Sequence, residues 1–286
     1  MIGAVLLAAA PAVWADDTPD VMREASTNWN IHYADDYCRL ARTFGTGDDA
    51  LVLMMDRFAP GDTFRITLVG EPTKIARQGG EAKIRFGPDM PEQSLKFFSG
   101  TLNGGVPMWI FSGSVGLRPI AVNNSKGDAA NIPISEAEEA AVTQLRIGAP
   151  LRTPVVLHMG SLKEPFAALR VCTDELLTHW GIDVDRHRQM TQAVKPIGSP
   201  GDWLTYQDYP SSMLKASKSG LVNFRLTVDE RGKPIGCSIQ KSTKPEGFDK
   251  AVCDALMRRA RFEPARDAEG KPLVSFYINS VHFQTS

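Results

Sequence analysis

Four cysteines are the residues of this chain whose types and spacing most directly suggest chemistry: Cys38, Cys172, Cys237 and Cys253. Thiolates bind zinc or form disulfides, and the chain lacks the Cys-x-x-Cys and His-x-x-x-His spacings that zinc sites commonly use. An even number of cysteines in an exported protein is typical of disulfides, and four cysteines allow three pairings. Their arrangement favours Cys38 with Cys172 and Cys237 with Cys253, whereas four free thiols are expected if the protein stays in the cytoplasm.

The other reactive side chains form no recognisable catalytic constellation. Asp35-Asp36 and Asp48-Asp49 lie in expected loops, where paired carboxylates are usually solvated turn residues. The glycine-rich segment 100–105 lacks the lysine and the following helix of a phosphate loop. Residues 113–116 depart from the Gly-x-Ser-x-Gly pattern of a nucleophile elbow. The histidines of the N-terminal two thirds share no metal-ligand spacing: His32, His158, His179 and His187. We therefore predict no catalytic site, no metal and no cofactor.

Composition narrows the class of partner. The chain has 286 residues, 43% hydrophobic and 23% charged, which is typical of a soluble globular protein of about two domains. A net charge of -1 argues against nucleic acid, because binding phosphates requires clustered positive charge. No polybasic stretch suggests an anionic lipid surface, and no motif identifies a small-molecule substrate.

The N-terminus predicts export. Residues 2–14 are almost wholly apolar, and Val13 and Ala15 occupy the two positions that a signal peptidase reads. We therefore predict a signal peptide over residues 1–15, in preference to a buried N-terminal helix. The apolar run is shorter than the roughly 20 residues that span a membrane. Because no Lys or Arg precedes it, the N-terminus could be incomplete, and only in that case is a membrane anchor expected.

Residues 16–181 predict a β-rich N-terminal domain. Short apolar or alternating runs separated by Gly and Pro are typical of a sandwich or an open barrel. The expected strands are 51–55, 64–69, 82–86, 108–112, 117–122 and 154–159. A helix after Ser161 carries Cys172 on its apolar stripe and closes the domain near Gly181. Cys38 lies in an expected short helix or edge segment, and Ser135 with Glu138 forms a capping-box pattern.

Residues 182–205 read as a linker, because Pro and Gly interrupt a polar stretch. Residues 206–286 then predict helix, strand, strand, helix, strand. Strict alternation over Val222–Val228 indicates a half-buried strand, and Gly232 suits the following turn. In the last strand, Leu273–Phe283, the apolar parity changes, which predicts a bulge near Ser280.

The motifs along this C-terminal segment resemble the C-terminal domain of the TonB family of energy transducers. They occur in the family's order: Gln207-x-Tyr209-Pro210, Gly220, Asp229-x-x-Gly232, Phe248-Asp249 and Arg261-Phe262-x-Pro264. The resemblance covers about residues 205–284. It implies a three-stranded antiparallel sheet with two helices, so the whole chain is expected to be a two-domain α+β protein.

The resemblance also implies a function. TonB domains bind a short peptide of an outer-membrane receptor by adding it as a strand to an open sheet edge. The implied partner-binding residues of this chain are Gln207, Tyr209, Pro210, Ser275, Tyr277, Asn279, Val281 and Phe283. The bland alternative for Tyr209 and Pro210 is that they only start a helix.

The chain departs from TonB proper in having a large extra domain where the family has a membrane helix and a long Pro-rich spacer. We therefore expect a periplasmic TonB-like protein in TonB-dependent transmembrane transport that binds receptor peptides by β-strand addition. The alternative is a soluble envelope scaffold or adaptor whose N-terminal β domain carries the specific binding, without energy transduction. An enzyme in the N-terminal domain ranks last. The sequence leaves open the receptor, the ligand of the N-terminal domain and the oligomeric state.

Overall fold

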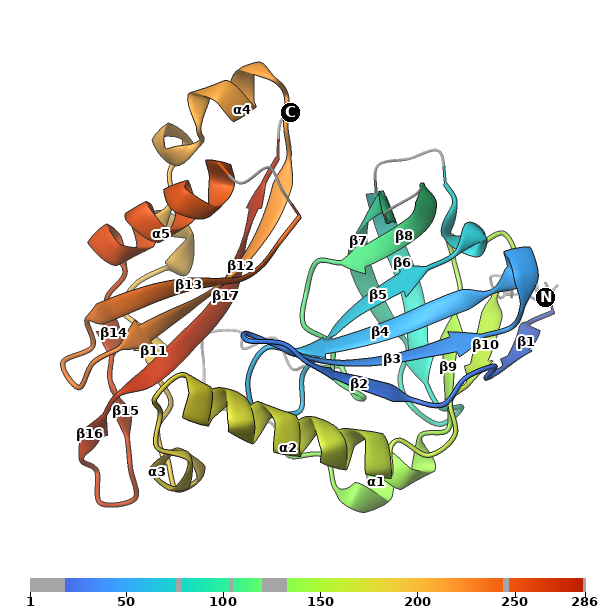
Figure 1. The fold of residues 1–286 in the computed structure, drawn as a ribbon, viewed down its shortest axis with the longest axis horizontal. Helices are drawn as coiled ribbons and strands as arrows, with labels where there is room; N and C mark the ends of the chain where they lie inside the picture. Colours follow the sequence, from blue (N-terminus) through green and yellow to red (C-terminus); the bar gives the residue numbers. More distant parts are fainter. Residues whose placement is uncertain (1–18, 76–78, 103–104, 120–132, 244–246, 285–286) are drawn as a thin grey trace, which may run out of the picture.

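The computed structural model describes residues 19–75, 79–102, 105–119, 133–243 and 247–284. Two hydrophobic cores are present, one built from residues before Leu177 and the other from Trp203 onward. Figure 1 shows the two domains beside each other, with helix α2 (Lys163–His179) running under the first and ending near the second. The expected α+β fold with two domains is confirmed.

The N-terminal domain is built on one ten-stranded sheet in the order β1-β10-β9-β6-β7-β8-β5-β4-β3-β2. Its strands are β1 (Val21–Glu24), β2 (Asn30–Tyr33), β3 (Cys38–Phe44), β4 (Leu51–Arg57), β5 (Arg65–Val69), β6 (Gly79–Phe86), β7 (Gln93–Leu102), β8 (Val106–Phe111), β9 (Gln144–Ile147) and β10 (Val155–His158). Only β1 and β10 are parallel, and all the other neighbours in this sheet are antiparallel.

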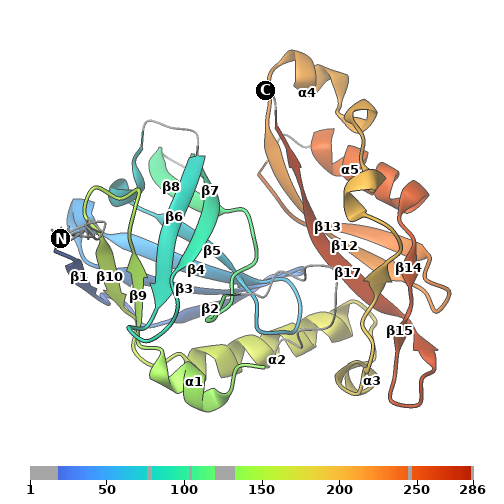
Figure 2. The ribbon, with the colours of Figure 1, turned by 180° about the vertical axis from the view of Figure 1, so that it is seen from behind.

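This sheet curls strongly, as both views of the ribbon show (Figures 1 and 2). The strands at its two ends, β1 and β2, follow each other in the chain, and Ala25 between them bridges to Phe44 of β3. The two ends of the sheet are therefore brought close together, and of the two expected architectures the structure has the open barrel.

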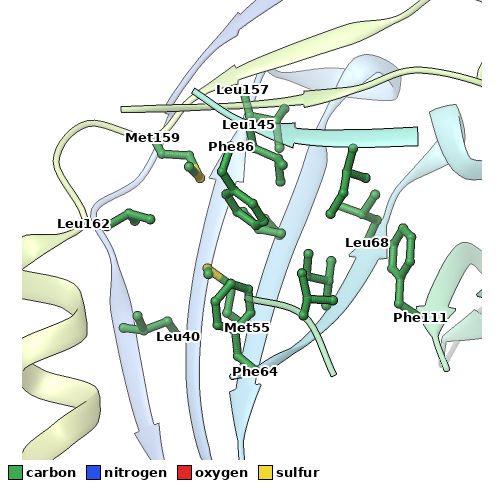
Figure 3. Packing of buried hydrophobic residues seen from close by; sticks show 14 of the residues in the cluster. Leu40, Met55, Phe64, Leu68, Phe86, Phe111, Leu145, Leu157, Met159 and Leu162 are labelled. Atoms are coloured by element: carbon green, nitrogen blue, oxygen red, sulfur yellow. The ribbon is translucent and has the colours of Figure 1, made fainter. Parts of the chain in front are cut away.

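Apolar side chains fill the concave side of the sheet. Figure 3 shows such side chains converging from several strands and from the turn before α2: Leu40, Met55, Phe64, Leu68, Phe86, Phe111, Leu145, Leu157, Met159 and Leu162. The rings of Phe97 and Trp109 stack with centroids 4.2 Å apart. Helix α2 covers the barrel beside β2 and β3, and a disulfide joins its Cys172 to Cys38.

Three sequence expectations for this domain need correction or completion. Cys38 lies on β3, an interior strand between β2 and β4, rather than in a helix or edge segment. Residues 117–119 form no strand, and residues 120–122 lie outside the described residues. Strand β7 was not expected, because its outer half is exposed and has no apolar alternation. The capping box at Ser135 and Glu138 is present and begins α1 (Glu136–Ala141).

The C-terminal domain contains a three-stranded antiparallel sheet in the order β13-β12-β17. Its elements are α4 (Ser211–Lys215), β12 (Gly220–Val228), β13 (Pro234–Ser242), α5 (Gly247–Arg259) and β17 (Ser275–Phe283), with the short pairs β11 (Lys195–Pro196) with β14 (Phe262–Glu263) and β15 (Ala265–Arg266) with β16 (Pro272–Leu273). Helix α5 packs on β12 and β13, and a disulfide joins Cys253 of the helix to Cys237 of β13.

The predicted bulge near Ser280 is absent. Strand β17 pairs with β12 from Ser275 to Phe283 in one continuous register, and the register shifts lie between β12 and β13 instead. The change of apolar parity has another cause, since both faces of β17 are covered. Phe283 packs on Phe248 of α5, whereas Phe276 packs on Trp180 of the N-terminal domain.

The segment 182–205 is packed along the C-terminal domain. It contains helix α3 (Val184–Arg188), the strand β11 that pairs with β14, and the 3-10 turn η3 (Pro200–Trp203). Trp203 is buried in the C-terminal core against Phe262 and Tyr277. Within the described ranges, no helix has the length and apolar character needed to cross a membrane.

Candidate peptide-binding edge

Strand β17 lies at the edge of the C-terminal sheet. Leu221 of β12 donates its N–H to Thr243 Oγ1 at 2.8 Å and accepts from Thr243 N–H at 3.0 Å, so the odd-numbered residues of β12 face the β13 side. The even-numbered residues of β12 therefore exchange hydrogen bonds with the odd-numbered residues of β17. The outward N–H and C=O groups of β17 belong to its even-numbered residues: Phe276, Ile278, Ser280 and His282. No strand of the described chain pairs with this outer edge.

A side chain of β17 itself satisfies one of these outward groups. Ser280 N–H donates to Asn279 Oδ1 at 2.8 Å, and Asn279 Nδ2 donates to the Tyr277 hydroxyl at 2.7 Å. The Asn279 amide thus holds the position that the carbonyl of an added strand would take. An unpaired edge is a template for any extended chain, and such a local cap limits unspecific pairing.

The strand residues predicted as partner contacts all have odd numbers, and four of the five turn their side chains toward the C-terminal core, whereas Asn279 is exposed at the edge. Ser275 is buried, and Tyr277 packs on Trp203 and Phe262. Val281 packs on the same core, and Phe283 stacks on Phe248 with ring centroids 4.2 Å apart. A guest strand at this edge would meet the backbone of β17 and the Asn279 amide rather than these four core-facing side chains.

The predicted residues before β12 are placed differently from one another. Gln207 is exposed in the 3-10 turn η4 (Tyr206–Asp208). Tyr209 packs its ring edge-on against Phe248, and its hydroxyl donates to the carbonyl of Lys218. Pro210 is the N-cap of α4. Tyr209 and Pro210 therefore help to build the domain, and only Gln207 presents a free polar surface.

The second face of the C-terminal sheet rests on the N-terminal domain. Gln240 of β13 donates to the carbonyl oxygens of Asp36 and Phe58 at 2.9 and 3.0 Å. The Arg225 guanidinium lies 4.2 Å from the centre of the Trp180 ring, and Phe276 meets the same ring edge-on. These contacts cover the even-numbered residues of β17 and the odd-numbered residues of β12, and they fix the direction from which a guest strand could approach.

A buried ion-pair cluster lies at this interface. Asp56 of β4 has no exposed surface, and it accepts two hydrogen bonds from Arg39 at 2.6 and 2.8 Å. Lys241 of β13 donates to the same carboxylate at 2.7 Å and so ties the two domains together. Burial alone would raise the pKa of Asp56, but Arg39 and Lys241 together outweigh it and hold this pKa below its usual value.

A cleft of about 450 Å³ opens between the domains beside the middle of β17. Its wall from the C-terminal domain includes Ile278, Asn279 and Ser280, which form the central part of the unpaired edge. The wall from the N-terminal domain is made by Asp56, Phe58, Ala59, Pro60, Thr63, Phe64, Arg65, Ser112, Gly113 and Ser114. An extended segment paired with β17 would therefore also touch the N-terminal domain.

Sequence reasoning missed the even-numbered residues of β17 and all the cleft residues of the N-terminal domain. Apolar residues at both parities of Leu273–Phe283 were the available signal, since they indicate a strand covered on both faces. The cleft has no local signal, because Arg65 and Asn223 are far apart in the chain and meet only at the domain interface.

Fold and edge together define a class of protein: a disulfide-bonded two-domain molecule with a small sheet that can accept a strand. Residues 205–285, less than a third of the chain, match the family model of the Gram-negative bacterial TonB protein C-terminal domain. The suspected resemblance is thereby confirmed for this domain, and the matched family is broadly involved in TonB-dependent transport. No curated protein matches the chain.

Proposed function

We propose that this chain is a periplasmic TonB-like protein that binds receptor peptides by adding them as a strand to the outer edge of β17. Outer-membrane receptors of TonB-dependent transport are the proposed partners. The observation that carries the proposal is the unpaired edge of β17 in the described chain, with outward backbone groups at Ile278 and Ser280. Backbone hydrogen bonds would supply affinity, and the flanking cleft would supply specificity.

The proposed compartment rests on two features that support each other. The predicted signal peptide over residues 1–15 directs the chain out of the cytoplasm. The disulfides Cys38–Cys172 and Cys237–Cys253 are stable where the environment is oxidising, as in the periplasm.

The N-terminal domain has a supporting part in this proposal. Its contacts at Gln240 and Lys241 fix the C-terminal sheet against the barrel, so that the edge of β17 opens into a preformed cleft. A preorganised cleft loses less conformational entropy on binding than a mobile one. Apolar side chains fill the concave side of the barrel, so the alternative, a scaffold that binds through its barrel alone, would use a cleft of about 1090 Å³ lined by barrel residues such as Arg23, Asp49 and Glu81.

The test compares two proline substitutions at opposite edges of the same sheet. Ser280→Pro removes an outward N–H of β17 and keeps the hydrogen bonds to β12 intact. Ile235→Pro is the matched control, because Ile235 is 55% exposed on β13 and lies at a register shift, where it is paired with no residue of β12. Both variants are measured against fluorescent peptides that cover the periplasmic N-terminal segments of TonB-dependent receptors.

The proposal expects wild type and Ile235→Pro to bind the same peptides with equal affinity, and Ser280→Pro to lose binding at least about tenfold, since several hydrogen bonds are blocked. Circular dichroism and thermal unfolding establish that both variants fold. Equal binding by all three proteins would contradict strand addition at this edge. Absence of any binding peptide would contradict receptor binding as such.

A further inference from the structure

A cluster of ionised side chains lies beside the interdomain cleft, and Asp56 and Arg65 of this cluster line the cleft. Arg39, Lys241 and Arg65 lie around a single carboxylate, that of Asp56, which already pairs with Arg39 and Lys241. The pair of Arg225 with Asp36 nearby is neutral by itself. The cluster around Asp56 therefore has an excess of positive charge, and Arg65 carries the part of it that lines the cleft.

Arg65 is the unusual member of the cluster. Arg65 is 7% exposed, and its Nη1 donates to the amide oxygen of Asn223 across the interface. Its guanidinium carbon lies 5.5 Å from the centre of the Phe58 ring, and its Nε is buried without a hydrogen-bond partner. Within the described residues, no carboxylate is close enough to form a salt bridge with Arg65. Asp56 on the neighbouring strand attracts the Arg65 guanidinium without a salt bridge, but burial outweighs this attraction and lowers the pKa of Arg65 to about 10.

We infer that the cleft is an acidic-residue subsite, in which Arg65 pairs with an Asp or Glu side chain of the strand added to β17. This inference rests on the proposed function and names the feature that selects among peptides. A guest strand would lie about 4.8 Å from β17, and its alternate side chains would point to the face occupied by Arg65 and Asn223. A guanidinium recognises a carboxylate through directional, charge-assisted hydrogen bonds.

The N-terminal domain therefore acts as the specificity element, and the TonB-like sheet supplies the generic backbone contacts. Asn223 holds Arg65 across the interface, so the two domains must be docked for the subsite to exist. Ser112, Gly113 and Ser114 from the turn after β8 line the same cleft as Arg65, and their side chains are small.

The experiment uses the full chain and the receptor peptide that binds it best. Each Asp and Glu of that peptide is replaced in turn by Asn or Gln, and affinities are measured for wild type, Arg65→Gln, Arg65→Lys and Arg225→Gln. Arg225 is the matched control, because it is also 7% exposed and lies at the same interface, but it has Asp36 as a partner and does not line the cleft. Thermal unfolding of each variant separates loss of fold from loss of recognition.

We expect one acid-to-amide change to weaken wild-type binding about tenfold or more, and Arg65→Gln to bind the acidic and amide peptides equally. Arg65→Lys should keep part of the preference, and Arg225→Gln all of it. Higher salt should reduce the preference as well. If every amide peptide binds wild type within about twofold of the parent, or if Arg65→Gln still prefers the acid, the acidic subsite is wrong.

The two proposals can fail separately. If Ser280→Pro abolishes binding while acid-to-amide changes have no effect, strand addition stands and the acidic subsite is overturned. If Ser280→Pro binds normally while Arg65→Gln loses the acid preference, the subsite stands and the β17 edge is the wrong place for the guest backbone. Absence of any binding peptide overturns both.

Discussion

Both domains hold a helix against their sheet with a disulfide, but the two sheets differ in whether their edges are brought together or left open. In each, a disulfide ties a helix to a strand beneath it: α2 to β3 through Cys172–Cys38, and α5 to β13 through Cys253–Cys237. The N-terminal sheet has ten strands and curls until its ends approach each other. The C-terminal sheet has three strands and, within the described residues, leaves the edge of β17 unpaired.

The difference shows where binding can occur in such a molecule. A sheet of ten strands can curl around its own core, so its end strands β1 and β2 stay short. A three-stranded sheet cannot close, and the long strand β17 therefore remains a template, with the N–H of Ser280 capped by Asn279. Docking of the barrel covers the second face of this sheet without covering its edge, and so turns an exposed surface into a defined cleft.

The largest expected effect concerns the two disulfides. In the chain-entropy model, the Cys38–Cys172 bridge closes a separation of 134 residues and stabilises the folded state by about 5 kcal/mol. The Cys237–Cys253 bridge closes a separation of 16 residues and stabilises by about 3 kcal/mol. Replacing each pair by serines should therefore destabilise the barrel more than the TonB-like domain. Urea unfolding of both variants measures this, and an inverted order would contradict the comparison.

The next effect concerns the coupling between the domains. Asp56→Asn leaves Arg39 and Lys241 buried without their carboxylate and should cost about 3–5 kcal/mol of unfolding free energy. Asp49→Asn is the matched control, because Asp49 pairs with Arg23 at the surface with its side chain 80% exposed, and should cost about 1 kcal/mol or less. If Asp56→Asn lowers the free energy of unfolding no more than Asp49→Asn does, the interface cluster adds no stability.

The same carboxylate predicts a pH dependence. Because the pKa of Asp56 is lowered in the folded state, its contribution is complete above the ordinary aspartate pKa of about 4. The contribution is lost as the pH falls through the lower pKa of the folded state. The free energy of unfolding of wild type should therefore fall more steeply below about pH 4 than that of Asp56→Asn. Parallel curves for the two proteins between pH 5 and the acid limit of folding would contradict this assignment.

A smaller effect is expected where the second face of β17 meets the barrel. Phe276 packs between Trp180 and His187, so Phe276→Ala should cost about 2 kcal/mol and loosen the docking of the domains. Limited proteolysis of the segment 182–205 should become faster, while the backbone groups at the edge of β17 are not altered by the substitution. Unchanged proteolysis would mean that the other contacts alone hold the domains together.

The smallest effect concerns the cap on the open edge. Asn279→Ala frees the N–H of Ser280, which should strengthen peptide binding by about twofold to fivefold, because one competing hydrogen bond is removed. Stability should change by less than about 0.5 kcal/mol, since Asn279 is exposed. Weaker binding by this variant would instead mean that Asn279 contacts the guest strand directly.

Much of the fold follows from local sequence patterns. The strict alternation from Val222 to Val228 and the apolar stripe around Cys172 correspond to β12 and α2, because one face of each packs on a core. The disulfide pairs are those favoured from the sequence, since each lies within one domain. The family resemblance of residues 205–285 supplied the fold of the C-terminal sheet, which single patterns would have left ambiguous.

The site could be predicted only in outline. The family resemblance implied that a guest would pair with β17, but the sequence could not show which backbone groups point outward, because this depends on the pairing with β12. The apolar parity of β17 was interpreted as a bulge, although apolar residues at both parities also fit a strand covered on both faces, which is what the continuous register shows. The contact between Arg65 and Asn223 depends on the tertiary structure, so neither the spacing of residues nor the composition indicates it.

The most direct test of the account is a backbone N-methyl scan of a bound receptor peptide. Each N-methyl group removes one donor, so methylation at alternate positions should abolish binding, while the positions between should tolerate it. This period of two, measured by fluorescence anisotropy with the full chain and lost with Ser280→Pro, is the result that strand addition to β17 predicts. Tolerance of N-methylation at every position, or sensitivity without alternation, would contradict it.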